Sequence, residues 1–439
     1  MSTPKTREAL SADGLISLVG QSFSRIKDHR PQPAIALSDV LMSAFAMFSL
    51  KDPSLLAFDE RRHEGNLRRL YGIIRVPSDT RMRETLDPVD PETLRPVFGD
   101  VFRALQRGKA LEQLVFLDGH FLLAMDATGY FSSTEVHCDS CLEKVNSTTG
   151  EISYSHQMVG VAIVHPGFRE VIPLAPEPII KQDGSSKNDC ERNATKRLLR
   201  KTRAEHPKMK FIVIEDGLAS NGPHIEEILA NNMSFILGAK PGDHKYLFEQ
   251  LVKAFEDDRA VIVAGRTDKG NAFEVCFVNQ VPLNESHQHL IVNFLQYTEH
   301  GPDGKVVRHF SWVTDIAITL DNAELLVRGA RGRWKIENET FNTLKNQGYQ
   351  FEHNFGHGKQ NLSVVFAMLM MLAFLVDQTQ QLACKLFQAV WEKCGSKRAL
   401  WEQLRSHFWH FKFDSMRHLY EVMLHDAAKE VPAPAIEKG

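Results

Sequence analysis

Residues 211–238 read FIVIEDGLASNGPHIEEILANNMSFILG. The segment begins with four apolar residues, Phe211 to Ile214, and these are followed directly by Glu215-Asp216-Gly217. A short apolar run that ends at a turn signal predicts a buried strand. Residues 225–231 then have a helical pattern, and residues 234–238 form a second short strand. A strand, a helix and another strand in succession predict an α/β core.

The pattern continues on both sides of this segment. Upstream, short apolar runs near glycines predict strands at residues 115–117, 122–125 and 156–164, and residues 188–203 are predicted to form a helix. Downstream, residues 261–263, 273–278, 290–294 and 306–312 are predicted strands separated by Gly, Asn and Asp turns. Helical patterns cover most of residues 9–107 and resume at residue 322.

These changes of pattern predict five successive regions. They are a helical N-terminal DNA-binding region (1–110), the first part of the core (111–240), a β-rich insertion (241–315), the second part of the core with an acidic helix (316–380) and a C-terminal helical region (381–439). In the first region, Ser38 is predicted to cap a helix that starts at Asp39, and the segment Ser78 to Thr80 to cap the next one.

Composition limits the location of the protein and its partners. The chain has 439 residues, enough for two or three domains, and its net charge of −3 does not by itself favour nucleic-acid binding. Six scattered cysteines indicate reduced thiols in a cytoplasmic protein. The longest apolar run, residues 364–376, is shorter than the roughly 20 residues of a membrane span. We therefore expect a buried helix there, and neither a signal peptide nor a membrane segment.

Positive charge is concentrated locally. Arg68 and Arg69 belong to an arginine-rich stretch between residues 61 and 83, and Arg197 and Arg200 lie on the basic helix predicted over residues 188–203. Such clusters are typical of surfaces that bind the DNA backbone. A solvated helical face is the alternative interpretation of each arginine.

Two aspartates follow predicted buried strands. Asp126 comes directly after Leu122 to Met125, and Asp216 follows Phe211 to Ile214 after one residue. On the second strand, Asp216 shares a face with Ile212 and Ile214, whereas Glu215 is expected to point the other way. Acids in line with buried positions need a partner or a metal ion. Asp118 is an alternative to Asp126, although its Asp-Gly dipeptide is also typical of a turn.

A third acid lies in residues 331–349, which read RGRWKIENETFNTLKNQGY. Arg333, Glu337, Phe341 and Lys345 recur every four residues, so a helix would place them along one stripe. A carboxylate between two cations can bind a metal ion while the cations contact phosphates on either side. The alternative is a ladder of surface salt bridges.

This segment resembles the Arg-Trp-x-Ile-Glu…Phe-x-x-Leu-Lys signature of bacterial insertion-sequence transposases of the DDE class, in the branch with a Tyr-x₂-Arg-x₃-Glu-x₆-Lys pattern. Asp126-Ala-Thr-Gly and Ile214-Glu-Asp216-Gly resemble the surroundings of the first and second aspartates of that family. The resemblance covers roughly residues 114–358.

The resemblance implies an RNase H-like catalytic core that is interrupted by the β-rich insertion. It implies that Asp126, Asp216 and Glu337 bind Mg²⁺ or Mn²⁺, and that Arg333 and Lys345 contact phosphates. The implied activity is metal-dependent cleavage and strand transfer of double-stranded DNA, at the element ends and the target. The implied assembly is a homodimer in a synaptic complex, at the nucleoid of a bacterial cytoplasm.

The chain departs from the family pattern at two positions. Ala330 stands where the family has tyrosine, and Lys345 comes one residue late when counted from Glu337, which leaves Glu339 as an alternative third acid. A catalytically inactive DNA-binding derivative and a nuclease without strand transfer are the alternative functions.

A different metal is suggested by His137-Cys138-Asp-Ser-Cys141. Two cysteines at this spacing suit a structural zinc site, but such a site needs four ligands. His156, His165 and Cys190 follow in the sequence, and ordinary thiols in a loop are the alternative. The Gly-rich basic segment from His353 to Asn361 is predicted either to contact phosphates or to connect two helices.

Overall fold

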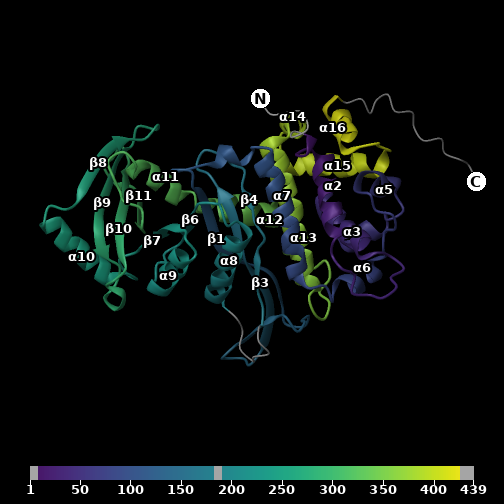
Figure 1. Cartoon of the computed structure of the whole chain (residues 1–439), viewed down its shortest axis with the longest axis horizontal. Coiled ribbons are helices and arrows are strands. Elements are labelled where there is room, and N and C mark those ends of the chain that lie inside the picture. The colour runs from purple at the N-terminus through teal and green to yellow at the C-terminus, as the bar shows by residue number, and fades with distance from the viewer. Residues whose placement is uncertain (1–7, 182–189, 426–439) are drawn as a thin grey trace, which may run out of the picture.

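A computed structural model describes residues 8–181 and 190–425. It is a mixed α/β protein in which one large sheet extends from a helical body at one end to a projecting β-rich part at the other (Figure 1). The predicted α/β class is therefore confirmed. The first residues of the helix predicted over 188–203 lie outside the described residues, and the described helix α8 is Glu191–Glu205.

The N-terminal region is helical, as predicted. Its elements are α2 (Ala12–Phe23), α3 (Leu37–Ser49), α4 (Leu55–Asp59), α5 (Gly65–Tyr71), α6 (Asp79–Leu86), η1 (Pro91–Leu94), α7 (Arg95–Arg107) and η2 (Leu111–Leu114). Ser78 caps α6 as predicted, since its Oγ accepts a hydrogen bond from the Arg81 N–H at 3.3 Å. The cap predicted at Ser38 is wrong: α3 begins at Leu37, because the Asp28 carboxylate accepts the Leu37 N–H at 3.0 Å.

The central part of the sheet combines antiparallel and parallel strands. Its elements are β1 (Phe121–Ser133), β2 (Leu142–Val145), β3 (Ile152–Val164), β4 (Ile172–Pro173), β5 (Glu177–Ile179), α8, β6 (Phe211–Glu215), α9 (Gly222–Ala230) and β7 (Ser234–Gly238). β1 pairs antiparallel with β3 and parallel with β6, and β6 pairs parallel with β7. All five residues of β6 are buried, as expected of a parallel strand with helices on both faces.

The β-rich insertion extends this sheet. It contains α10 (Lys245–Glu256), β8 (Val261–Arg266), β9 (Ala272–Pro282), η3 (Glu285–His287), β10 (Ile291–His300) and β11 (Val306–Thr314). β11 pairs antiparallel with β7, so the strand order β2-β3-β1-β6-β7-β11-β10-β9-β8 is continuous. The four predicted strands are present, and the helix α10 precedes them.

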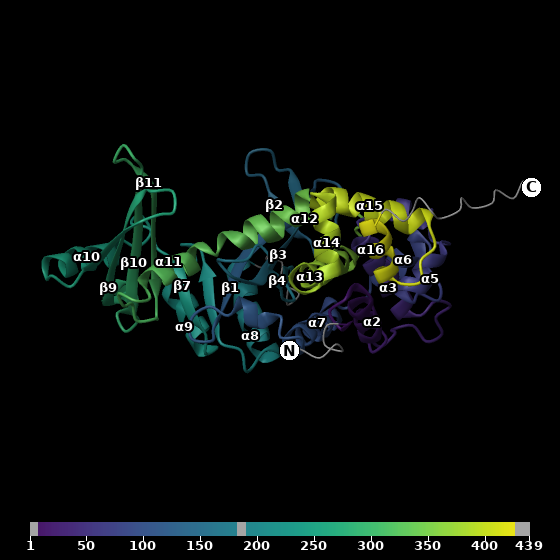
Figure 2. The ribbon, with the colours of Figure 1, turned by 90° about the horizontal axis from the view of Figure 1, so that it is seen from above.

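The chain then returns along the sheet as a helical segment. α11 (Ala323–Arg331), a π-helical turn (Ile336–Phe341) and α12 (Asn342–Asn346) run along one side of the central strands, whereas α8 and α9 lie on the other side (Figure 2). This arrangement covers both faces of the strands that carry the predicted aspartates.

The C-terminal helices join the N-terminal ones in a single body. They are α13 (Leu362–Ala383), α14 (Lys385–Cys394), α15 (Lys397–His410) and α16 (Met416–His425). α13 packs against α3 and α7, and Asp13 of α2 accepts the Met416 N–H at 2.7 Å. α13 is long and apolar enough to cross a membrane, but 94% of its most apolar 18-residue window is buried in the protein. The predicted buried helix is therefore confirmed.

Candidate active site

Asp126 lies on β1, and Asp216 comes directly after the neighbouring parallel strand β6. Leu122 of β1 pairs with Ile212 of β6, and Ala124 pairs with Ile214. Asp126 and Asp216 each come two residues after the last of these pairs, Ala124 and Ile214. Both residues line one cavity of about 580 Å³ at this end of the strands.

Glu337 is brought to Asp126 by an arginine. Arg333 Nη1 lies 2.6 Å from Glu337 Oε1 and 3.4 Å from Asp126 Oδ2. The close approach of this helical segment to the sheet depends on Gly160, which pairs with Asp126 across β1 and β3. A Cβ at Gly160 would lie 2.7 Å from the Phe341 ring, so a larger residue would push the segment away. The structure thus places Asp126, Arg333 and Glu337 together.

The helical segment contains a π turn from Ile336 to Phe341. A π turn holds one more residue than an α turn and commonly arises as a single-residue bulge. The extra residue offsets the late position of Lys345. In a regular α-helix, Lys345 would lie about 80° around the axis from Glu337. When the π turn takes up one residue, the angle between the two side chains falls to about 20°. Lys345 Nζ itself pairs with Glu352 Oε1 at 2.8 Å.

A fourth acid, Glu191, joins the cavity from the first turn of α8. Burial raises the pKa of Glu191, and the negative charges of Asp216 and Glu215 add to the effect. Burial also raises the pKa of Asp126 to about 7, with Arg333 opposing the shift and Glu337 and Glu191 increasing it. No periodic pattern in the sequence indicates Glu191, because it lies at the start of a helix. Carboxyl groups that raise one another's pKa in this way favour the binding of a cation.

The side chains of Glu215 and Asp216 differ from the prediction. Glu215 is buried, and its Oε2 lies 2.6 Å from Nε2 of the buried His224, which lies in the first turn of the neighbouring helix α9. Asp216 lies just past the strand and is exposed, and its Oδ1 accepts the Leu218 N–H at 2.9 Å. The prediction that Asp216 aligns with buried positions is wrong, because both faces of β6 are covered by helices and the strand ends before Asp216.

The two alternative acids lie elsewhere. Asp118 has a left-handed backbone conformation with φ 48° in the turn before β1, whereas Asp126 lies within that strand and not after its end. Glu339 faces away from Asp126, and its Oε1 lies 3.9 Å from Arg169 Nε. Of the two candidate third acids, Glu337 is therefore the one beside Asp126.

The arginines predicted to bind DNA have different surroundings. Arg197 Nε lies 2.7 Å from Oε1 of the buried Glu177, and Arg200 contacts both carboxylate oxygens of Glu227 at 2.7 and 2.6 Å. Arg68 and Arg69 are exposed in the last turn of α5, on the helical body. The first pair thus stabilises the fold around α8, and DNA contact by any of the four stays a prediction.

The cysteines of the predicted zinc motif lie in a buried cluster with two histidines. The ligand atoms of Cys138, Cys141, His156 and His357 all lie within 4.8 Å of one another. Such a Cys₂His₂ group can hold a metal ion such as zinc. His165 and Cys190 are not part of it: His165 packs against Phe168, and Cys190 lines the acidic cavity. The sequence did not indicate His357, which is 216 residues from Cys141.

Comparison of the sequence with protein-family models finds no match, and comparison with curated proteins finds none.

Proposed function

We propose that this protein is a DDE transposase, which cleaves DNA and transfers the cut strand in a metal-dependent reaction. The observation that carries the proposal is that Asp126 contacts the same arginine as Glu337 and lines the same cavity as Asp216. Asp126 lies on β1, Asp216 comes directly after β6, and Arg333 contacts both Asp126 and Glu337. A strand, a strand end and a packed helix supply the acids, as expected for an RNase H-like core, which we propose for this part of the sheet.

The donor atoms suit a hard divalent cation. Carboxylate oxygens are the side-chain ligands that Mg²⁺ and Mn²⁺ prefer, and Asp126, Asp216 and Glu337 would hold such ions. The bound ions would activate water or a 3′-hydroxyl group and stabilise the leaving oxygen. Arg333 already offsets the repulsion between two of the carboxylates, and it lies where it can donate hydrogen bonds to a phosphate. The cavity beside the acids leaves room for the DNA backbone.

The proposal is tested with a plasmid that carries the DNA flanking the coding sequence, incubated with the purified protein and Mg²⁺ or Mn²⁺. We expect cleavage and joined products from the wild type. Asp126→Asn, Asp216→Asn and Glu337→Gln each remove one carboxylate charge and should lower the cleavage rate on the order of a thousandfold or more.

Glu339→Gln is the matched control, since it changes an acid two residues from Glu337 that faces away from Asp126. It should keep cleavage close to the wild-type rate. Cleavage without joined products would indicate a nuclease and overturn strand transfer. A wild-type protein that binds DNA but does not cleave it would overturn the enzymatic proposal altogether.

A further inference from the structure

We infer that Cys138, Cys141, His156 and His357 bind a zinc ion that fastens the β1–β3 strand pair to the loop before α13. The four residues come from three places: a turn after β1, the strand β3, and the loop at 353–361. The inference does not depend on phosphodiester chemistry. It concerns a second metal, held by softer ligands than the carboxylates of the proposed active site.

The distances between the ligand atoms match a tetrahedral site. Cys138 Sγ lies 3.8 Å from Cys141 Sγ, and His156 Nε2 lies 3.3 and 3.5 Å from these two sulfur atoms. His357 Nε2 lies 3.3 Å from Cys141 Sγ. Zinc bonds of about 2.3 Å to sulfur and about 2.0 Å to nitrogen, at tetrahedral angles, separate two sulfurs by about 3.8 Å and a sulfur from a nitrogen by about 3.5 Å. The side chains therefore already lie at zinc-ligand spacing.

The chemistry of the cluster selects the metal and excludes a disulfide. A disulfide needs a sulfur–sulfur distance of about 2.05 Å, well below the 3.8 Å between these two thiols. Two thiolates and two imidazoles suit Zn²⁺ far better than Mg²⁺ or Ca²⁺, which prefer oxygen ligands. All four residues are buried, with exposed fractions from 0% at His156 to 8% at Cys138. A metal ion would provide a common partner for the two sulfur and two nitrogen atoms of this buried cluster.

Backbone hydrogen bonds hold the turn that carries the two cysteines. The Cys141 N–H donates to the Cys138 carbonyl at 3.1 Å, and the Cys138 N–H donates to Cys141 Sγ at 3.4 Å. The turn also reaches the second part of the site, because the Asp139 N–H donates to the Lys359 carbonyl at 3.1 Å. The imidazole rings are held by aromatic neighbours. Tyr130 stacks on His156, and Phe131 packs against His357 with a centroid distance of 4.3 Å.

The loop that carries His357 is held from its other side by Asp87. The Asp87 carboxylate accepts the N–H groups of Lys359, Gln360, Asn361 and Leu362 at 2.9 to 3.2 Å, at the start of α13. Gly358 has φ +70°, and a Cβ at this position would collide with that carboxylate, so the close approach requires glycine. These contacts fix the direction in which the loop presents His357.

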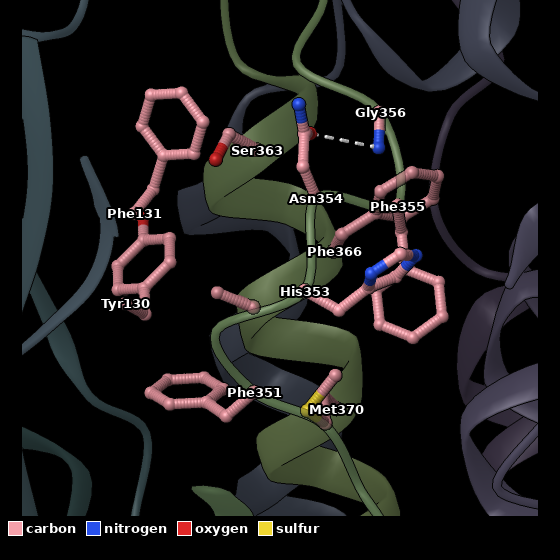
Figure 3. Close-up of a pocket in the computed structure, with 11 residues that line it drawn as sticks. Tyr130, Phe131, Phe351, His353, Asn354, Phe355, Gly356, Ser363, Phe366 and Met370 are labelled. Atoms are coloured by element: carbon pink, nitrogen blue, oxygen red, sulfur yellow. Dashed lines mark hydrogen bonds between the residues drawn. The ribbon is translucent and has the colours of Figure 1, made fainter. Parts of the chain in front are cut away.

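The same loop packs tightly on β1. Figure 3 shows Tyr130, Phe131 and Phe351 gathered beside Phe366 and Met370 of α13, with the loop residues His353 to Gly356 alongside. The cavity between them is only about 20 Å³, too small for a ligand larger than water. A zinc ion beside this packing would join the strand pair that carries Asp126 to the segment that follows the Glu337 helix. It would close a loop of 216 residues between Cys141 and His357.

The first experiment measures metal in the full-length protein purified without added metal or chelator. Inductively coupled plasma mass spectrometry should find one zinc per chain. Cys141→Ser and His357→Ala should lose that zinc, whereas Cys276→Ser, a buried thiol of β9, and His353→Ala, in the same loop, should keep it.

A second measurement does not depend on the folding of the variants. Wild-type protein stripped of zinc and reloaded with Co²⁺ should show a thiolate-to-cobalt charge-transfer band and the visible absorption of tetrahedral cobalt. A wild-type protein that carries no zinc and gives no such spectrum would overturn the inference.

The joining role is tested by limited trypsin digestion. Lys359 is exposed in the loop beside His357, and its backbone is held at both its N–H and carbonyl groups. Removal of zinc with a strong chelator should speed cleavage after Lys359 on the order of tenfold, because opening the loop no longer requires breaking the metal site. An unchanged rate, with zinc shown to be removed, would overturn the fastening role and leave a purely local metal site.

Discussion

The acidity of Asp126 is set by its position near the middle of a largely buried strand. Most strand-end aspartates are solvated, but Asp126 lies opposite Gly160 and beneath the segment that carries Arg333. Burial therefore raises the pKa of this carboxyl to about 7. A buried carboxyl group is costly to ionise when no cation is bound. A bound cation therefore stabilises its ionised form more than it stabilises the ionised form of a solvated carboxyl group.

Buried His206 makes the stability of the protein depend on pH. His206 packs on Phe102 with a ring distance of 4.3 Å. Burial, with the charges of Arg103, Arg95 and Arg203, lowers the pKa of His206 from 6.5 to about 4. Between these values the unfolded chain binds a proton that the folded protein does not, so stability falls as the pH drops below about 6.5.

We therefore expect the wild type to lose about 2 kcal/mol of unfolding free energy through His206 between about pH 7 and pH 5. In urea denaturation at the two pH values, the unfolding free energy of His206→Gln should fall by about 2 kcal/mol less than that of the wild type. His410→Gln, at an exposed position in α15, is the control and should keep the wild-type pH dependence. Equal pH dependence in His206→Gln and wild type would contradict the assignment.

At the scale of one element, the π turn reconciles two requirements on the helical segment. Upstream, Arg333 must face Glu337 and Asp126; downstream, the buried side chains of Phe341 and Leu344 must face the core. One surplus residue in a regular helix would rotate one half by about 100° relative to the other. The π turn absorbs that residue, so both halves keep their contacts.

Deleting Asn338, an exposed residue within the π turn, should therefore convert the turn to α-helix without rotating either half. We expect the unfolding free energy to change by less than about 1 kcal/mol, measured by chemical denaturation. The matched deletion of exposed Arg328 in the regular helix α11 should cost more than about 2 kcal/mol, because it rotates Leu326 and Val327 relative to Ala330. Equal losses from both deletions would rule out a single-residue bulge.

At the scale of the whole molecule, the two ends of the chain form one helical body around a buried ion pair. Lys51 follows α3, and Nζ of this residue pairs with Asp377 of α13 in the interior. Tyr349 also donates a hydrogen bond to Asp377 Oδ2 at 2.5 Å, and the Lys51 ammonium lies 3.8 Å from the Trp401 ring centroid. The network thus connects four segments that are far apart in the sequence.

Burial raises the pKa of Asp377 and lowers that of Lys51, so each charge depends on the other. Lys51→Met and Asp377→Asn should each cost about 3–5 kcal/mol of unfolding free energy, because each leaves one buried charge unpaired. The double variant should be more stable than the sum of these losses predicts, and a denaturation cycle measures the difference. Additive losses would show that the two charges do not interact.

Local patterns of residues determined much of this protein. The short apolar runs predicted β1, β3, β6 and β7 because strands buried by helices must be apolar on both faces. The strand predicted at residues 115–117 is wrong, because that run belongs to the connection between η2 and β1. Ser78 predicted the start of α6 because capping depends on a few adjacent residues. The spacing of Arg333 and Glu337 predicted their contact for the same reason, since one helical turn joins them.

Tertiary structure decided the features that depend on residues outside a single strand or helix. The Asp28 carboxylate, and not Ser38, accepts a backbone N–H at the start of α3. His224 is the buried partner of Glu215. Glu191 entered the acidic cavity, and His357 joined Cys138 and Cys141, only once the sheet and helices had assembled. A sequence pattern records which side chains share a strand or a helical turn. It does not record which elements pack together, and contacts between residues hundreds of positions apart depend on that packing.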